Sequence, residues 1–481
     1  MKFKMKNERG SISLFVLLSA LFFLVVVTSV GVSFKNKETR IDTEFAKIKA
    51  SYEKDIGNEE QIYLEKTNNE ENVDFLTDND YLIVMEASKS KFEGKINVGT
   101  IEEFKNLVEH GQFNYKNAYL YENIELNGSE TNAWTPIGTS TNKFDKIFDG
   151  RNYSINGIYA NSSEQGQALF RYNAGTIKNL TVKGQIDCNA IGVAGVVGKN
   201  DGTIENCTSN VTIIGNEFVG GVVGYNSTTG LVKNCTSNNY IKGKQLVGGI
   251  VGESDGTITD CVNNGKVEST SNEESTVTPG LLGIGGITGA TYGNISNSKN
   301  SGEIVSVSYN IGGIVGMSHN AQISKCFNDG AIITRGFLFV GGIVGCQDGN
   351  TSSINYCYNL NSVEGGHNIG GIVGALRAGS VNNCYNVGQI SSYLDLSQHD
   401  NGVLCAGGIA GYNTDSAQIN NCYSLDSLNI EIVGIPAENT VDSLSKKETE
   451  ANMKSAEFIT TLNSTENNFK KGDGYPILSW Q

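Results

Sequence analysis

Short apolar phrases alternate with polar turn residues along most of this chain, and the alternation repeats. The phrase apolar-Gly-Gly-apolar-apolar-Gly, or a close variant of it, occurs eight times. The steps between its second glycines are 26, 28, 37, 27, 29, 29 and 37 residues, from positions 195, 221, 249, 286, 313, 342, 371 and 408. A period of this length indicates a stacked array of small structural units.

Most repeats carry two more apolar phrases. One has the form Thr/Ser-Ile-x-Asn-Cys and ends at Cys207, Cys235, Cys261, Cys326, Cys357, Cys384 and Cys422. The other is Gly-x-Val/Ile, as in Gly265–Val267. Each phrase is too short for a helix and rich in β-branched residues, and Asn, Asp, Ser and Gly separate the phrases. The pattern therefore predicts three short strands and three turns per repeat.

One coil of three strands cannot bury its own inward face, so the coils are expected to stack strand on strand. The predicted fold is an all-β parallel β-helix or β-solenoid of about nine coils over residues 113–435, with 148–157 and 175–180 as its opening coil. Ile, Val and Cys are expected in the inner columns, and glycines at corners where a Cβ would collide. Only 4 prolines occur in 481 residues, which suits strands that need their amide donors.

These repeats resemble the GLUG motif of bacterial surface and secreted proteins, over roughly residues 113–435. The flanks 132–138 and 474–481 are also similar to those of such chains. The resemblance implies a β-solenoid displayed outside the cell, often in adhesins, and it implies no single activity.

The N-terminal region predicts a membrane anchor. Residues 11–34 carry no charge over 24 positions, after a basic tip at residues 1–10. We expect an uncleaved transmembrane helix, an extracellular body, and a juxtamembrane helix with a linker over residues 35–80. A cleaved secretory signal is the competing interpretation. Pilin-like processing is a third, because Arg9-Gly10-Ser11 is similar to a type IV prepilin leader, although Phe15 stands where such chains usually carry Glu.

Short helical segments are predicted to close both ends of the array. In the N-terminal cap, residues 81–112, Thr100 and Glu103 have the spacing of a capping box at the start of a helix over 100–110. In the C-terminal cap, residues 436–481, we expect a helix over residues 445–463. Such caps protect end strands from pairing with other chains.

Seven of the ten cysteines occupy one phase of the repeat, and Ser298 and Leu180 take the same phase in other coils. Small apolar side chains that fill a narrow inner corner explain this pattern better than disulfides or a metal site. We therefore expect reduced thiols at these positions. Cys188, Cys346 and Cys405 lie outside this phase, and the sequence assigns them no role.

The sequence offers little catalytic chemistry. Its net charge is −15, and no stretch is basic enough to follow a nucleic-acid backbone, so nucleic acid is not an expected partner. The four histidines, His110, His319, His367 and His399, form no zinc motif, and no cofactor or metal site is predicted. Asp145, Asp149 and Arg151 lie close in sequence, but a salt-bridged turn is the expected role. No catalytic residue is therefore assigned.

The best interpretation is a membrane-anchored surface protein that acts in adhesion or as a structural element, with a host or matrix glycan or protein as its ligand. A carbohydrate-active β-helix lyase or hydrolase and a pilus-associated subunit are the alternatives. The two 37-residue steps contain extra residues at 270–283 and 393–405. Both leave the same corner, four coils and about 19 Å apart, and we expect them to flank one ligand groove.

Overall fold

The computed structural model describes residues 80–86, 97–270, 282–336, 338–394 and 405–481. All of them belong to one compact unit, Leu76–Gln481. The predicted anchor at 11–34, the prepilin-like residues before it and the predicted juxtamembrane helix lie outside these ranges. Within the described ranges, no helix is both long enough and apolar enough to cross a membrane.

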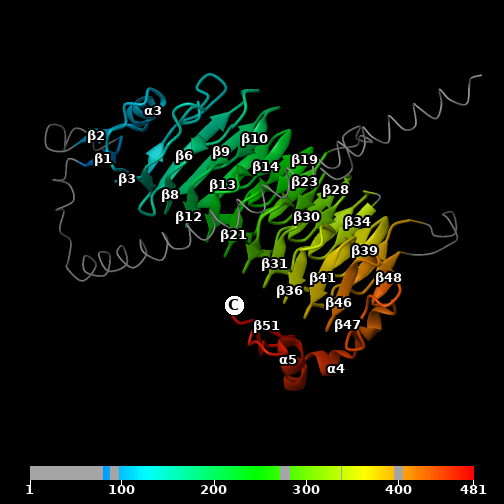
Figure 1. The fold of residues 1–481 in the computed structure, drawn as a ribbon. Helices are drawn as coiled ribbons and strands as arrows, with labels where there is room; N and C mark the ends of the chain where they lie inside the picture. The colour runs from blue at the N-terminus through cyan, green and yellow to red at the C-terminus, as the bar shows by residue number, and fades with distance from the viewer. Residues whose placement is uncertain (1–79, 87–96, 271–281, 337, 395–404) are drawn as a thin grey trace, which may run out of the picture. The chain divides into compact units, whose positions relative to one another are not determined.

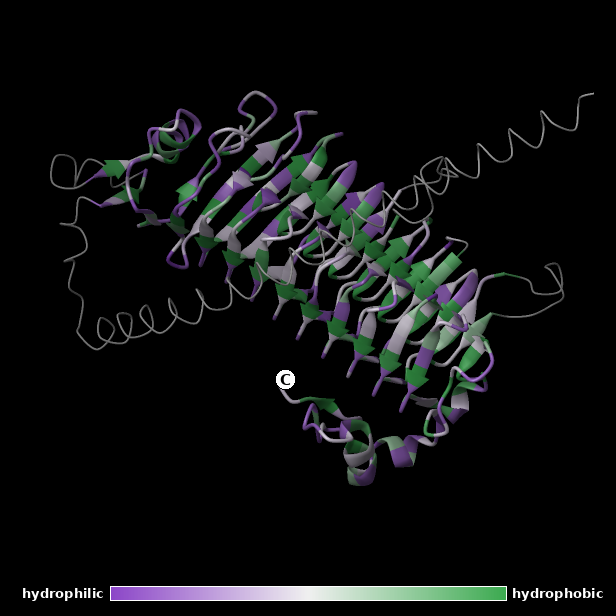
Figure 2. Ribbon diagram, in the orientation of Figure 1, coloured by the Kyte–Doolittle hydropathy of each residue, from purple (hydrophilic) through white to green (hydrophobic). Residues whose placement is uncertain are grey.

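A parallel β-solenoid forms the body, as the repeat predicts (Figure 1). Strands of successive coils pair in register; Ile204, for example, pairs with Val232, which pairs with Ile258. The long ladders contain 13, 10 and 8 strands. Apolar residues recur at the same places in successive coils (Figure 2). The prediction of about nine stacked coils is confirmed.

The prediction of three strands per coil is wrong, because a regular coil has five. One coil consists of β14 (Glu217–Gly220), β15 (Val223–Asn226), β16 (Leu231–Lys233), β17 (Thr236–Ser237) and β18 (Ile241–Gly243). The Gly-Gly phrase spans the corner between the first two strands instead of forming a single strand. The reason is steric: a Cβ at Gly342, the second glycine of one copy, would lie 2.1 Å from the carbonyl oxygen of Gly371 in the next coil.

Val and Ile side chains of the phrase point inward, as predicted. Val340, Ile343 and Val344 have 0 % exposure and belong to the continuous core that runs through the solenoid. Their counterparts in the neighbouring coils are equally buried, so each side chain packs against copies of itself above and below. Stability therefore comes from contacts between adjacent coils, as in other repeat proteins.

The Asn of the Asn-Cys phrase forms another corner of each coil. Nine successive residues at this place have left-handed backbone geometry, with φ between 47° and 54°: Asn179, Asn206, Asn234, Asp260, Asn297, Lys325, Tyr356, Asn383 and Asn421. Asn adopts this geometry more easily than most residues. The repeated Asn therefore sets the direction of the chain as it leaves β16 and its equivalents.

The N-terminal end of the solenoid extends further than the sequence suggests. The opening coil was expected near residue 148, but β3 (Asn117–Leu120), β1 (Tyr81–Val84) and β2 (Val98–Gly99) continue the same ladder below β5 (Ile147–Asp149). The predicted capping box is confirmed: Thr100 Oγ1 accepts from the amide of Glu103, and Glu103 Oε2 accepts from the amide of Thr100. It starts α3 (Ile101–Glu109), whose buried Phe104 joins the core.

At the C-terminal end, the predicted single helix over 445–463 is wrong. Residues Lys446–Glu448 form β49, which pairs with β47 (Tyr423–Leu425) as one more rung of the ladder. Two short helices follow, α4 (Glu450–Met453) and α5 (Ala456–Asn463), each with a hydroxyl N-cap. A small hairpin of β50 (Phe469–Lys470) and β51 (Ile477–Leu478) ends the chain. The helix is interrupted because Ser455 caps a new one.

Candidate functional site

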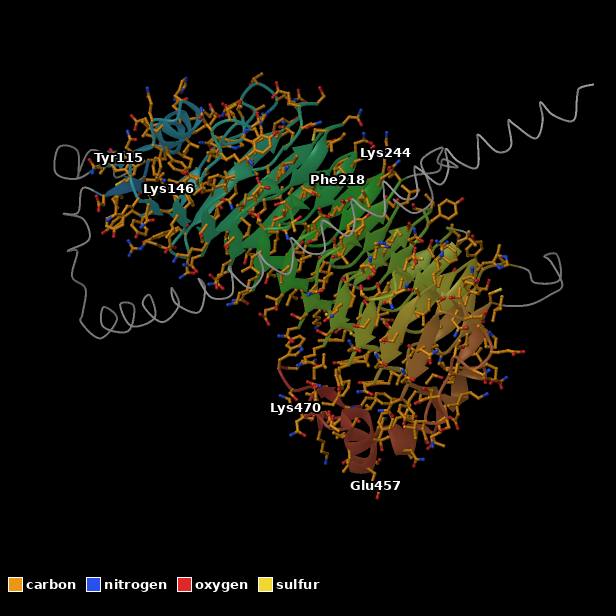
Figure 3. The ribbon with its side chains drawn as sticks, viewed as in Figure 1. Tyr115, Lys146, Phe218, Lys244, Glu457 and Lys470 are labelled. Carbon is orange, nitrogen blue, oxygen red and sulfur yellow. The ribbon has the colours of Figure 1, made fainter. Side chains whose placement is uncertain are left out.

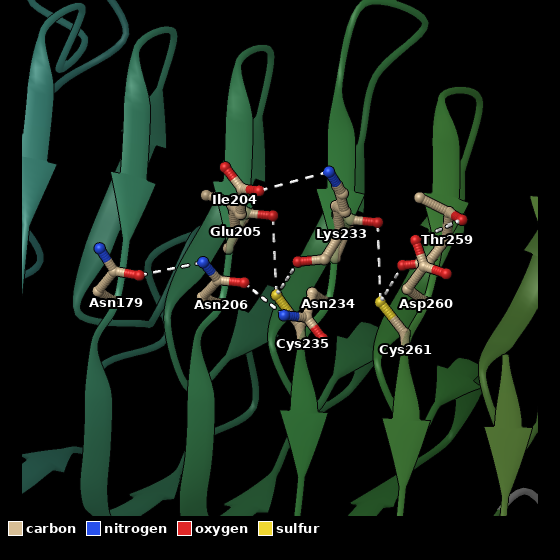
Figure 4. Close-up of polar contacts among 11 residues, drawn as sticks. Asn179, Ile204, Glu205, Asn206, Lys233, Asn234, Cys235, Thr259, Asp260 and Cys261 are labelled. Carbon is tan, nitrogen blue, oxygen red and sulfur yellow. Dashed lines mark hydrogen bonds and ion pairs between the residues drawn. The ribbon is translucent and has the colours of Figure 1, made fainter. Parts of the chain in front are cut away.

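The seven cysteines of the repeat form one fully buried column. Ser298 and Leu180 occupy the same column, as the sequence predicts. Each thiol donates to the carbonyl two residues earlier, for example Cys235 to Lys233 at 3.2 Å (Figure 4). All seven are free, and burial raises the pKa of the Cys207, Cys261, Cys326 and Cys384 thiols. The column is therefore part of the continuous core of the solenoid.

Asn ladders bind the coils together on and below the surface. At the left-handed corner, Asn206 donates to Asn179 at 3.1 Å, and Asn234 donates to Asn206 (Figure 4). A second ladder is buried and lies at the C-terminal end of β15 and its equivalents. Its members are, in order, Asn173, Asn200, Asn226 and Ser254, and the side-chain hydrogen bonds between neighbours are 2.8, 2.8 and 3.1 Å long. These amides are satisfied by one another and by the backbone, so they hold the fold.

The acidic and basic residues considered for catalysis lie in a turn. Asp149 Oδ1 accepts from the amide of Arg151 at 2.8 Å and from Asn179 Nδ2 at 3.0 Å. The Arg151 guanidinium lies over the ring of Tyr121, 5.8 Å from its centroid. Asp145 pairs with Lys146 at 3.3 Å. The turn is thus held mainly by bonds to the backbone and to Asn179, instead of by the expected Asp–Arg bridge.

The three histidines within the described ranges are not gathered into a site. His110 Nδ1 lies 2.8 Å from the carbonyl oxygen of Asn106 at the end of α3, and His319 lies 3.9 Å from Asp348. His367 belongs to β39 (His367–Gly370), and His399 lies outside the described residues. In the part of the chain that the structure describes, no group of three or more His, Cys, Asp or Glu side chains could hold a metal ion.

An aromatic row on the outside of the last coils was not predicted. Its members directly follow column cysteines or their equivalents and are stacked in the order Phe327, Tyr358, Tyr385 and Tyr423. Tyr358 and Tyr385 have ring centroids 4.9 Å apart and planes within 4°. The equivalent earlier positions are Thr208, Thr236, Val262 and Lys299, so the row is confined to four coils.

The C-terminal strap, residues 449–481, covers this aromatic row. Phe458, Leu462 and Phe469 pack against the row in one apolar cluster. The hydroxyl of Tyr385 donates to the carbonyl of Pro476, and that of Tyr358 donates to Gln481 Oε1 at 2.7 Å. Glu457 and Lys470 of the strap are exposed (Figure 3). The strap is therefore an integral part of the fold.

Most of each predicted insertion lies outside the described residues, but the strands on either side are clear. The first insertion joins β23 (Val267–Ser269) to β24 (Ile284–Gly285), and the second joins β43 (Ile390–Ser392) to β44 (Ala406–Gly407). The strands before them belong to one ladder, four pairings apart, and the strands after them belong to another. Both insertions thus leave the same corner, as the sequence predicts.

We call the described part of this corner the insertion corner: residues 306–311, 334–336, 338–340, 363–369 and 392–394. Tyr393 reaches along it, because its hydroxyl donates to the carbonyl of Arg335 at 2.8 Å, two coils away. The Arg335 guanidinium lies 5.1 Å from the Tyr393 ring centroid and pairs with Glu364. Phe339 has φ 60°, which is uncommon for an aromatic residue and requires support from its surroundings. Val307 is 37 % exposed.

Comparison with known proteins gives two sequence matches. Residues 215–241, one coil of the array, match the model of the GLUG motif. A segment of 162 residues is 38 % identical to halomucin of Haloquadratum walsbyi, and this match covers 32 % of the present chain but 2 % of halomucin. The chain thus corresponds to a small fraction of that relative.

One solved structure also matches, a proposed immunoglobulin A1 protease from Bacteroides ovatus, at 16 % identity, over 79 % of this chain and 90 % of that one. Its TM-score of 0.31 supports no conclusion about fold or activity. The next coil pairs in register with the matched coil on both sides of the Gly-Gly and Asn-Cys corners, and it has Gly248-Gly249 at the first corner and Asp260-Cys261 at the second. One coil of the described array therefore matches the GLUG motif, and the coils next to it repeat its architecture.

Proposed function

We propose that this chain is a membrane-anchored extracellular β-solenoid that acts by display and adhesion, with no catalytic role. One observation carries the proposal: the regular ladders continue through the array, while both long insertions leave a single corner. Loops tolerate added residues cheaply, and insertions collected on one face of a solenoid commonly form its binding face. The GLUG motif and the halomucin match support a surface or structural role.

In this proposal, residues 11–34 hold the chain in the membrane, and the body lies outside the cell. The ligand is a host or matrix glycan or protein that contacts the insertion corner. The corner suits such a ligand because it combines an exposed apolar side chain, Val307, with the charged pair of Arg335 and Glu364. Tyr393 adds an aromatic ring with a polar tip, a side chain that is frequent at interfaces.

The test is adhesion of cells that display the full-length chain to immobilised matrix glycoproteins and to a glycan array. Deleting residues 271–281 and 395–404 is expected to leave the melting profile intact and to weaken adhesion. The double variant Arg335→Ala/Tyr393→Ala is expected to act in the same direction, and Lys178→Ala/Lys183→Ala, on other walls, serves as its control. Unaltered adhesion after the double deletion would contradict a binding role for this corner.

A further inference from the structure

A second surface of the solenoid has an unusual composition. We call it the neutral wall: the outward side chains of β21 (Thr257–Thr259), β26 (Ile295–Ser296), β31 (Gln322–Ser324), β36 (Ser353–Asn355), β41 (Gly379–Asn382) and β46 (Ala417–Asn420), which lie in sequence along one ladder (Figure 1). Its twelve side chains are Thr257, Thr259, Asn294, Ser296, Gln322, Ser324, Ser353, Asn355, Ser380, Asn382, Gln418 and Asn420.

Every one of these side chains is a hydroxyl or a carboxamide, and none is charged. The three preceding coils of the same ladder differ, because Lys178, Glu205 and Lys233 occupy the equivalent outward positions. The residue between each outward pair, such as Ile295 or Ile354, is fully buried. The outer surface of the wall is therefore formed by the polar side chains. The wall is thus uncharged over six coils, in a chain that carries 87 charged residues, 36 basic and 51 acidic.

The polar groups of the wall are ordered by bonds along the solenoid axis. Ser296 Oγ donates to Thr259 Oγ1 at 2.9 Å, and Asn382 and Asn420 donate to the amide oxygens one coil below at 2.7 and 2.9 Å. A carboxamide has two donors and an acceptor with two lone pairs, so each bond leaves capacity for a ligand. Groups held in this way lose little side-chain entropy when a ligand binds.

Exposed aromatic rings border the wall on both sides. Tyr292, two residues before Asn294, is 36 % exposed and contacts the His319 ring edge-on at 5.8 Å. On the other side, Trp480 of the strap is 38 % exposed. Its indole Nε1 donates to the carbonyl of Lys325, the residue that directly follows Ser324, at 2.9 Å. The two rings therefore border adjacent coils of the wall from opposite edges.

We propose that the neutral wall binds a neutral polysaccharide that lies along the solenoid axis. Sugar hydroxyls both donate and accept hydrogen bonds, which matches the hydroxyl and carboxamide rows, and the apolar faces of sugar rings pack on aromatic rings such as Tyr292 and Trp480. Equivalent groups recur about every 4.8 Å over about 24 Å, so a polymer meets a similar set of donors at each coil. Many weak contacts then add along one chain.

The wall does not suit an anionic polymer, because it contains no cation to pair with the polymer's charges. This inference goes beyond the adhesion proposal and concerns a different surface, since the insertion corner lies on other ladders. The two proposals can therefore fail independently.

Affinity gel electrophoresis of the full-length chain in a neutral detergent tests the inference. Hydroxyethyl cellulose, dextran and galactomannan serve as neutral probes, and polygalacturonate serves as the charged one. We expect at least one neutral polymer to retard the protein, and polygalacturonate to leave its mobility unchanged. The variant Gln322→Arg/Gln418→Arg places bulky, hydrated charges at two exposed positions of the wall and is expected to weaken binding by roughly tenfold or more.

The matched control is Gln185→Arg/Thr212→Arg, which adds the same charge at exposed positions of another ladder and is expected to bind as the unchanged protein does. Deleting residues 271–281 and 395–404 is also expected to leave polysaccharide binding unchanged, which separates this site from the insertion corner. The inference is overturned if no neutral polymer retards the protein, if only polygalacturonate does, or if the control or the deletion weakens binding as much as the wall variant.

Discussion

Single residues act in this molecule as members of columns, so a substitution affects the coils above and below as well as its own. Cys357 illustrates this point: its sulfur donates to the carbonyl of Asn355 in its own coil and accepts from the amide of Cys326 in the coil below. The side chain thus supports two coils with one small, buried group. Ser298 can replace a cysteine in the column because its hydroxyl makes the same bond, to the carbonyl of Ser296, at 2.8 Å.

The first prediction concerns these cysteines. Titration of thiols in protein denatured without reductant should find most of the seven column cysteines free, because their sulfurs are already engaged by backbone groups. In the native protein the same thiols should react slowly with labelling reagents, since burial raises the pKa of several of them and blocks access. Fewer than half free would show that the column is a disulfide ladder.

Cys346 predicts how the free energy of unfolding depends on pH. It is almost fully buried, and this burial raises the pKa of its thiol from about 9 to about 11. A thiol whose pKa is higher in the folded state stabilises that state fully below its unfolded pKa. This contribution should therefore be present at pH 8 and decline as the pH rises from about 9 through about 11. Cys346→Ala should reduce that decline in urea unfolding curves, with Cys405→Ala, at a less buried thiol, as the comparison.

The second prediction tests the inner columns. Ile343→Asp places a carboxylate among Ile314, Ile372 and other fully buried side chains, where no cation can pair with it. We expect a loss of more than about 4 kcal/mol in the free energy of unfolding of the surrounding coils. Thr212→Asp, at an exposed position that pairs with the uncharged Gln185, is the control and should be nearly neutral. Equal melting profiles for both variants would mean that the column faces solvent.

At the scale of elements, the strap and the aromatic row form one unit that reinforces the last four coils. The row supplies a flat apolar surface, and α5 with the final hairpin covers it. Phe458 meets Tyr423 edge-on at 5.0 Å, and Phe469 lies 5.9 Å from Tyr385. The hydroxyls of Tyr358 and Tyr385 are also bonded to the strap, whereas that of Tyr423 donates to Asn421. Burial raises the pKa of Tyr358 and Tyr385.

The third prediction follows from this unit. Tyr385→Ala should destabilise the C-terminal region by about 3–5 kcal/mol, because it removes a fully buried ring from the middle of the row. Tyr385→Phe should cost only about 1 kcal/mol, since it loses just the bond to Pro476. Limited proteolysis of the strap should follow the same order. Tyr172→Ala, at a partly exposed ring, is the control, and release of the strap by that variant would contradict the assignment.

The sequence predicted the elements unevenly, for physical reasons. The stacked coils, inner columns and capping box were accessible because each depends on residues that repeat or lie within four positions of one another. The strap was not, because its partners, such as Tyr358 and Gln481, are 123 residues apart. The Gly-Gly corner was mistaken for one strand because apolar residues on both sides of a sharp corner look continuous in sequence. The insertion corner was located correctly from the spacing alone.

At the scale of the whole molecule, the fourth prediction concerns attachment. The uncharged run at residues 11–34 should remain in the mature protein, so the intact mass of the natively produced chain should include it. Replacing Leu21 and Val25 by Arg should release the chain from the membrane fraction, because a charge at the centre of a spanning helix is costly. Removal of residues 1–10 alone would instead indicate prepilin processing, and loss of the whole run would indicate a cleaved signal.

The buried ladder at the C-terminal end of β15 has a further consequence for how the chain finds its structure. Coils this similar invite mistakes in which one coil pairs with the next but one. The ladder disfavours such mispairing because successive coils carry different residues at this position: Asn226, Ser254, Thr291 and Ser318. If the Ser254 coil were skipped, Thr291 would take the place of Ser254 beside Asn226, and its extra methyl group would have to fit into a fully packed column, which costs about 1–3 kcal/mol. The changing residues of the ladder thus favour pairing of each coil with its neighbour in the sequence.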